Sequence, residues 1–361
     1  MVDINLDSQL EKTLIELSEE SDNADHFLTQ YKQSKRHLEN EVYDWVQSEC
    51  NWFTDHGDQH ISAVMHQASR LLENELRNFH DEDLTELDVY LLLTTTLWHD
   101  VGMIMDRTTH EEISTEVSDR FVETAFPTGS IKAAADDIIK AHRKRDGLDI
   151  PQKSADFNYN NEVYKVYPKS LAGILRFADE ISETQERVSG DSWIQSIVPS
   201  DSEIYWRYAQ TIQGCYPHLN GKSININIEM DYDRAIKKYP CPDSFESRSD
   251  DDGEICLIEY VVCRLEKLVN ELSYCERYFN RYVEIRDVEL DMTIRDDSNN
   301  ILKDIDETIS ASGLKTKGNY PNVEIYDRFF EEYTVCKPDQ LLGIDQLESD
   351  DVELPHQGDQ Q

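Results

Sequence analysis

LWHDVGM, at residues 97–103, is the stretch around which the rest of this chain is organised. It ends a strongly apolar run, and this pattern predicts a buried helix over about 83–104. The helix would deliver His99 and Asp100 near its C-terminal end, where Gly102 allows the chain to turn. An imidazole and a carboxylate suit first-row transition ions, but one such pair is weak evidence for a metal site.

Upstream, FTDHGDQH at residues 53–60 leads into a predicted helix over about 58–79. His60, Val64 and Ala68 are four residues apart, so they share one face of that helix. A histidine on an inward face must be hydrogen-bonded or metal-bound, because burying it unpaired is costly. For His60 considered alone, a hydrogen-bonded core histidine is the better interpretation.

Downstream, two further predicted helices carry histidines. A capping box at Thr109 opens a helix over 110–125 that has His110 in its first turn. The segment 130–145 is also helical in pattern, and His142 falls on or near its apolar face. Either histidine could be a satisfied core residue or a ligand.

A buried carboxylate is predicted after these helices. We expect a loop over 146–167, after which Pro168 begins a helix with Leu171, Leu175 and Asp179 spaced four apart. Asp179 therefore continues an apolar stripe, and a buried carboxylate needs a cation or a metal as its partner. Six candidate ligands result, in this order along the chain: His60, His99, Asp100, His110, His142 and Asp179.

The order of these residues resembles the HD superfamily of metal-dependent phosphohydrolases, which has one histidine, a His-Asp doublet, optional further histidines and a distal aspartate. The resemblance covers roughly residues 50–190, through HISAVMHQASRLL at 60–72, LWHDVGM and LAGILRFADEISETQERV at 171–188. More narrowly, DHGxxH followed by LRFADE and a mixed α/β tail is similar to HD hydrolases with a C-terminal extension. The implied fold is mainly α, an HD-type helical bundle with an α+β C-terminal extension.

The resemblance also implies a role for each ligand. A first metal would be held by His60, His99, Asp100 and Asp179, and Asp100 would bridge to a second metal bound by His110 and His142. One or two divalent ions are expected, of Mn, Fe, Mg, Co, Ni or Zn. A metal lowers the pKa of its bound water towards neutrality, so a metal-bound hydroxide would attack phosphorus. The short spacing from His99 to His110, without a GYP motif, disfavours cyclic dinucleotide hydrolysis of the HD-GYP type.

Other polar residues have two interpretations each. His56 would act as a proton donor or outer ligand in catalysis, or would cap its loop through a backbone contact. The basic cluster Lys140, Arg143, Lys144 and Arg145 would bind substrate phosphates, or would place cations at a helix C-terminus. Arg176 would also face the substrate, although a salt bridge with a carboxylate is the better interpretation.

The chain divides into four predicted parts: N-terminal helices packing on the core over 1–50, the HD metal-binding domain over 51–190, an α+β extension over 191–335 and a disordered acidic tail over 336–361. In the extension, alternation predicts strands over 224–230 and 288–294, separated by a helix over 254–281. The first strand should pair in a hairpin with 204–213 through a turn at Leu219–Lys222. Residues 296–318 are polar and are expected to be mobile.

Composition limits the partners. Acidic residues outnumber basic residues by 74 to 35 in the 361-residue chain, which gives a formal charge of -39 and disfavours nucleic acid and anionic membranes. Seven cysteines without a CxxC pair, and a first segment without a hydrophobic signal core, predict a cytoplasmic protein with reduced thiols. The alternatives for assembly are a homo-oligomer and a protein partner bound through the extension.

The leading functional hypothesis is therefore a metal-dependent phosphohydrolase that acts on a nucleotide or another small phosphorylated substrate. An HD-fold di-iron oxygenase resembling inositol oxygenase uses the same ligand types and is an alternative. A non-catalytic nucleotide sensor or assembly module is the other alternative, and the intact set of six ligands argues against it.

Overall fold

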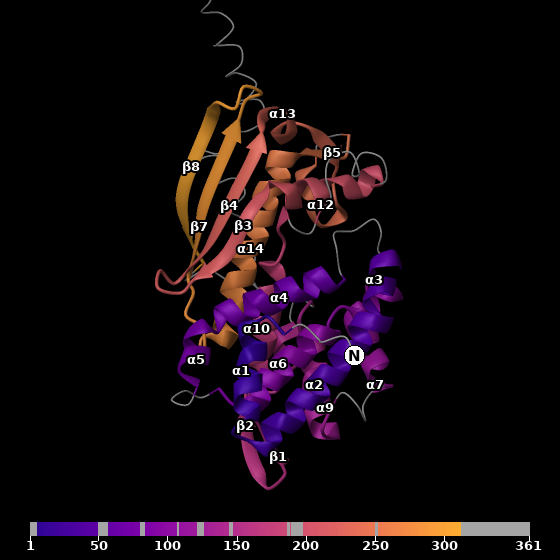
Figure 1. The fold of residues 1–361 in the computed structure, drawn as a ribbon. Coiled ribbons are helices and arrows are strands. Elements are labelled where there is room, and N and C mark those ends of the chain that lie inside the picture. Colours follow the sequence, from indigo (N-terminus) through magenta and orange to yellow (C-terminus); the bar gives the residue numbers. More distant parts are fainter. Residues whose placement is uncertain are drawn as a thin grey trace, which may run out of the picture.

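The computed structural model describes residues 6–49, 57–79, 84–106, 108–120, 126–143, 147–185, 188, 198–249 and 252–311. A helical part contains most of the chain up to residue 185, and a four-stranded sheet follows it (Figure 1). The long helix α14 runs behind the sheet and reaches the helical part (Figure 1). The mainly α fold with an α+β extension is thereby confirmed.

The helical part is built around one fully buried helix. Every residue of α6 (Glu86–Trp98) from Leu87 to Trp98 is buried, which explains its continuous apolar sequence. A capping box between Thr85 and Asp88 begins this helix. Packed around it are α1 (Gln9–Ser18), α2 (Asp22–Glu41), α4 (Asp58–Leu71), α7 (His110–Asp119), α9 (Gly129–Ala141) and α10 (Pro168–Glu180).

Short elements complete the helical part. They are α3 (Tyr43–Glu49), α5 (Glu73–Arg77), the 3₁₀ turns η2 (Val101–Ile104) and η3 (Gly147–Asp149), and the hairpin of β1 (Ala155–Tyr159) and β2 (Glu162–Val166). The predicted helix over 83–104 thus ends at Trp98, and η2 follows it. The predicted helix over 58–79 is interrupted at Leu72, between α4 and α5.

Two predictions in this part are wrong. The predicted loop over 146–167 contains η3 and the β1–β2 hairpin. Asn160 and Asn161 adopt φ angles of 46° and 71° and close the tight turn between the two strands. The capping box at Thr109 is also absent. Thr109 lies at the N-cap of α7, but its hydroxyl donates to Asp106 Oδ2 at 3.0 Å instead of capping the helix.

The extension contains a mixed sheet in the order β3-β4-β7-β8, with bounds Ile212–His218, Ser223–Asp231, Asp287–Arg295 and Ile301–Ser310. Strands β4 and β7 are parallel, and α14 (Leu257–Phe279) makes the crossover between them. Between β4 and α14 lie α13 (Tyr232–Ala235), β5 (Lys238–Pro240), η5 (Asp243–Arg248) and β6 (Glu254–Cys256). The strands predicted over 224–230 and 288–294 and the turn at 219–222 are confirmed.

Two predictions for the extension are wrong. Residues 204–213 belong mainly to α12 (Ser200–Thr211), and β3 is the true hairpin partner of β4. The aromatic residues at 205, 206 and 208 are of types common in strands, which explains the wrong prediction. In the structure Ile204, Tyr208 and Thr211 are buried with helical spacing. The polar stretch after 296 contains β8, an edge strand in which Ile305 and Ile309 are buried. Residues beyond 311, including the predicted tail, lie outside the described residues.

The extension packs directly on the helical part. One hydrophobic core cluster contains buried residues of both, and α10 packs against α14, where the rings of Phe177 and Phe279 are 5.8 Å apart. Gln67 on α4 also donates to the carbonyl oxygens of Ile181 and Cys215. The predicted boundaries at 50 and 190 fall among residues that the structure does not describe, so that division stays a prediction. None of the described helices is long and apolar enough to cross a membrane.

Candidate metal centre

Six side chains from five helices converge at one place in the helical part. His60 lies in the first turn of α4, and His110 begins α7. His99 and His142 follow the last residues of α6 and α9 as their C-caps. The set is completed by Asp100 just before η2 and by Asp179 in the last turn of α10. The six predicted ligands are therefore brought together, each from a helix end.

The ligand atoms form two groups. His60, His99 and Asp179 make one group, and Asp100, His110 and His142 make the other; within each group the ligand atoms lie within 4.8 Å of one another. Five of the six side chains are almost fully buried, while that of Asp179 is 32% exposed. The centre is thus most open beside Asp179.

Asp100 lies between the two groups and directs one carboxylate oxygen to each. Its Oδ2 atom is 3.3 Å from His60 Nε2 and 3.5 Å from His99 Nε2. Its Oδ1 atom is 3.2 Å from His110 Nε2 and 3.7 Å from His142 Nε2. This is the arrangement of a carboxylate that can bridge two ions.

The spacing of the donor atoms fits divalent metal ions. Two ligand atoms that each lie about 2.1 Å from one ion are roughly 3.0–3.4 Å apart at octahedral or tetrahedral angles. The Nε2 atoms of His110 and His142 are 3.1 Å apart, and His60 Nε2 is 3.3 Å from Asp179 Oδ1. In addition, His99 Nε2 is buried and makes no hydrogen bond. Buried histidine and aspartate groups of this kind could hold a metal ion.

Backbone carbonyl groups orient two of the histidines for this role. His99 Nδ1 is 2.9 Å from the oxygen of Thr96, and His142 Nδ1 is 2.5 Å from the oxygen of Ile139. Because a carbonyl only accepts, both Nδ1 atoms must donate, which leaves the Nε2 lone pairs directed into the centre. Burial lowers the pKa of His99 to about 4, against the opposing charges of Asp100 and Asp179, so this imidazole is neutral at pH 7.

His110 is held differently. Its Nδ1 atom is 2.8 Å from Nη1 of Arg143, and a guanidinium only donates. A neutral His110 therefore carries its proton on Nε2, opposite Asp100 Oδ1. For His110 to act as a metal ligand through Nε2, this proton must leave and Arg143 must turn away from Nδ1.

The partly exposed carboxylate of Asp179 is held in its ionised form. Burial raises the pKa of Asp179, but the hydrogen bond and charge interaction with His60 outweigh it, so the pKa lies well below its usual range. An ionised Asp179 at the open edge of the centre supplies the negative charge that a divalent cation needs.

Two residues that the sequence analysis did not assign to the site hold the His-Asp doublet in place. Ser114 on α7 accepts from the backbone N–H of Gly102 at 2.8 Å and donates to the oxygen of His99 at 2.8 Å. A Cβ atom on Gly102 would lie 2.1 Å from the carbonyl oxygen of His110. Gly102 is thus needed for the close approach of η2 to α7; Ser114 carries no sequence signal that could have identified it.

The predicted substrate-binding residues have different surroundings. Arg176 forms a buried ion pair with Glu271, with Nε to Oε2 at 2.7 Å, so the salt-bridge interpretation is confirmed. Lys140 lies in the last turn of α9, where its charge interacts with Asp136 and Asp137. Arg143 contacts His110, as described above. The remaining members of the predicted set, His56, Lys144 and Arg145, lie outside the described residues.

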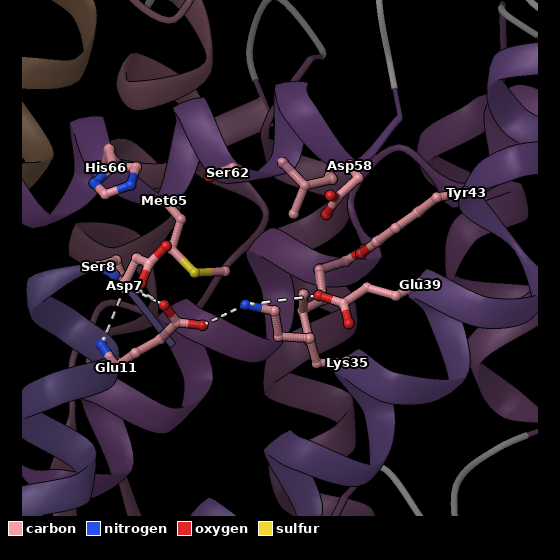
Figure 2. A pocket seen from close by; sticks show the side chains of 12 residues that line it. Asp7, Ser8, Glu11, Lys35, Glu39, Tyr43, Asp58, Ser62, Met65 and His66 are labelled. Atoms are coloured by element: carbon pink, nitrogen blue, oxygen red, sulfur yellow. Dashed lines mark hydrogen bonds and ion pairs between the residues drawn. The ribbon is translucent and has the colours of Figure 1, made fainter. Parts of the chain in front are cut away.

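A cavity of about 90 Å³ lies beside α4 (Figure 2), and none of the six candidate ligands lines it. Asp58, Ser62 and Met65 of α4 line it, and helical spacing puts them on the face opposite His60. Figure 2 shows Lys35 between Glu11 and Glu39, at distances of 2.8 and 3.7 Å. Lys35 holds the pKa of the buried Glu11 carboxyl below its usual value although burial raises it. This network ties α1 and α2 together.

In a comparison with family models, HD-CE, the HD domain with a C-terminal extension, matches residues 48–240 of the chain. The match includes all six ligands and extends through α12, β3 and β4 into the extension. Comparison with curated proteins gives no match.

Proposed function

The chain belongs to the HD-CE family, and from this membership and the geometry of its centre we propose that it is a metal-dependent phosphohydrolase. The proposed substrate is a nucleotide or another small phosphorylated compound. The observation that carries the proposal is the division of Asp100 between the two ligand groups, with Oδ2 facing His60 and Oδ1 facing His110. A shared carboxylate is what two adjacent ions require.

Divalent ions in these two groups would lower the pKa of a water molecule and neutralise charge on phosphoryl oxygens. The side chains of the protein perform the remaining tasks. Burial keeps His99 neutral, and the carbonyl of Ile139 fixes the tautomer of His142. The partly exposed Asp179 marks the edge of the centre from which a substrate would enter.

Arg143 is the proposed substrate-binding cation. It is exposed and contacts His110, at the edge of the group formed by Asp100, His110 and His142. When His110 Nε2 acts as a ligand, Nδ1 carries the proton, so Arg143 can no longer donate to it. The released guanidinium is then available to form paired hydrogen bonds with a phosphate. Lys140, Lys144 and Arg145 are proposed to add positive charge nearby, and His56 is proposed as a proton donor.

The charge of the chain supports a small substrate over a nucleic acid. With a formal charge of -39, the protein repels long polyanions, whereas a nucleotide interacts only with the local cations of the site. A low sensitivity of substrate binding to salt is the expected result.

The test is a screen of the full-length protein, stripped of metal and reloaded separately with Mn²⁺, Mg²⁺, Co²⁺, Ni²⁺, Zn²⁺ or Fe²⁺, against nucleotides and other phosphorylated compounds. Release of phosphate, pyrophosphate or triphosphate is measured by ion-exchange chromatography. We expect metal-dependent hydrolysis of at least one compound. Asp100→Ala should lower the rate by about 100-fold or more, because loss of a ligand exceeds the 10–100-fold effect of groups behind the ligands.

Asp156→Ala is the matched control, since Asp156 is an exposed carboxylate on the hairpin and should leave the rate unchanged. Oxygen consumption by the iron-loaded protein without phosphate release would identify an oxygenase instead. Nucleotide binding without turnover, unaffected by Asp100→Ala, would identify a sensor.

A further inference from the structure

Five polar side chains form a stripe along α14: Arg264, Lys267, Glu271, Tyr274 and Tyr278. They are spaced three, four, three and four residues apart, so they lie on one face of the helix. We propose that this polar stripe of α14 positions the helix ends that carry His142 and Asp179. On this proposal, which rests on the proposed function, residues of the C-terminal extension help to hold the metal ligands in place.

One half of the stripe acts on the end of α9 through Arg176 of α10. Glu271 accepts two hydrogen bonds from Arg176, from Nε at 2.7 Å and from Nη2 at 2.8 Å. Arg176 in turn directs Nη1 to the carbonyl oxygen of Ala141 at 3.4 Å, and Ala141 immediately precedes His142. The guanidinium also lies over the Tyr274 ring, 5.0 Å from its centroid. The position of His142 therefore depends on a residue of α14 through one buried arginine.

The same half also holds the chain after His142. The Tyr274 hydroxyl accepts from the backbone N–H of Leu148 at 3.2 Å, and the Tyr278 hydroxyl donates to Asp149 Oδ1 at 3.0 Å. Contacts with α14 thus lie on both sides of the short segment that follows α9.

The other half of the stripe acts on the end of α10. Lys267 Nζ is 2.6 Å from Glu180 Oε2, and Glu180 is the neighbour of Asp179. Arg264 forms ion pairs with Glu180 at 3.6 Å and with Glu183, and it lies over the Tyr208 ring. His142 and Asp179 belong to different ligand groups. One helix of the extension, α14, therefore contacts residues that hold a ligand-bearing helix end of each group.

Docking of α14 on α10 does not require these charges. Apolar contacts such as Phe177 with Phe279 already join the helices, and buried ion pairs often stabilise no more than apolar residues of equal volume. What the directional contacts add is a fixed orientation, and a metal site tolerates deviations of only about 0.5 Å in its ligands. The stripe therefore orients the helix ends that carry His142 and Asp179, in addition to joining α14 to the helical part.

The test measures Mn²⁺ affinity by calorimetry in full-length protein in which only one ligand group is intact. His60→Ala leaves the group of Asp100, His110 and His142, and His110→Ala leaves the group of His60, His99 and Asp179. Glu271→Gln should weaken Mn²⁺ binding by about 10–100-fold in the His60→Ala background and by less than about threefold in the His110→Ala background. Arg264→Gln should give the reverse pattern.

Glu276→Gln is the matched control, because it makes the same chemical change on α14 outside the stripe and should not alter either affinity. Tyr274→Phe removes a single oxygen and should weaken Mn²⁺ binding mainly in the His60→Ala background, as Glu271→Gln does. If Glu271→Gln does not fold, Tyr274→Phe replaces it in the test. Equal effects of Glu271→Gln in both backgrounds, or none in either, would overturn the positioning role. If wild-type protein does not bind Mn²⁺, the same comparison is made with whichever of the other five ions it does bind. Wild-type protein that binds none of the six ions would overturn the proposed function itself.

Discussion

At the scale of single residues, the two oxygens of Asp100 define the centre, because each faces a different ligand group. The candidate ligands could be predicted from the sequence because these histidines and aspartates lie on predicted helices. Their order along the chain also resembles that of the HD superfamily. The contact of Arg143 with His110 Nδ1 could not be predicted, since it depends on how the end of α9 meets the start of α7.

Gly102→Ala is expected to damage the centre without changing any ligand. The added Cβ would lie 2.1 Å from the carbonyl oxygen of His110 and 2.7 Å from the backbone nitrogen of Ser114, so η2 and α7 must move apart. We expect a loss of about 1–3 kcal/mol in the free energy of unfolding, measured in urea, together with weaker Mn²⁺ binding.

Gly129→Ala is the control for this substitution. A Cβ on Gly129 would meet nothing within 4 Å, so the change should alter the free energy of unfolding by no more than about 1 kcal/mol, in the stabilising direction. Equal behaviour of the two variants would contradict the close packing assigned to Gly102.

At the scale of elements, the sequence predicted helices and strands with strong apolar periodicity and missed those with mixed patterns. The stripe of Leu171, Leu175 and Asp179 identified α10, and Pro168 marked its beginning correctly. The β1–β2 hairpin was missed although Asn160-Asn161 is a turn signal, because polar residues obscured the alternation of buried Phe157 and Tyr159. Edge strand β8 was missed for the same reason.

The N-terminus of α6 should make stability depend on pH. Burial raises the pKa of Asp88 from 3.8 to about 7, against the hydrogen bonds from Thr85. Because the folded-state pKa is the higher one, folding favours the protonated carboxyl. Its contribution is complete below about pH 4 and is lost as the pH rises through 7.

Asp88→Asn keeps an acceptor for Thr85 and removes the ionisation. Relative to the variant, the wild-type protein should therefore lose up to about 4 kcal/mol of unfolding free energy between pH 4 and pH 8, at about 1.4 kcal/mol per pH unit. Urea unfolding of both proteins across this range measures the difference. Parallel curves for the two proteins would show that Asp88 is ionised in the folded state throughout.

At the scale of the whole molecule, the extension and the helical part share one hydrophobic core, and α14 reaches from the sheet to α10. The sequence indicated an α+β extension but could not show whether it packs on the helices, because contacts between distant segments leave no local pattern. The polar stripe on α14 became recognisable only when its partners on α9 and α10 were seen.

The central claim is that the folded chain holds divalent metal ions between its two ligand groups. Elemental analysis of the full-length protein measures this most directly, before and after incubation with Mn²⁺, Fe²⁺, Co²⁺, Ni²⁺, Zn²⁺ or Mg²⁺ and removal of excess ion. We predict that at least one of these metals binds at about two ions per chain and that Asp100→Ala retains at most one. Pure, folded protein that contains no metal and takes up none of the six would contradict the account.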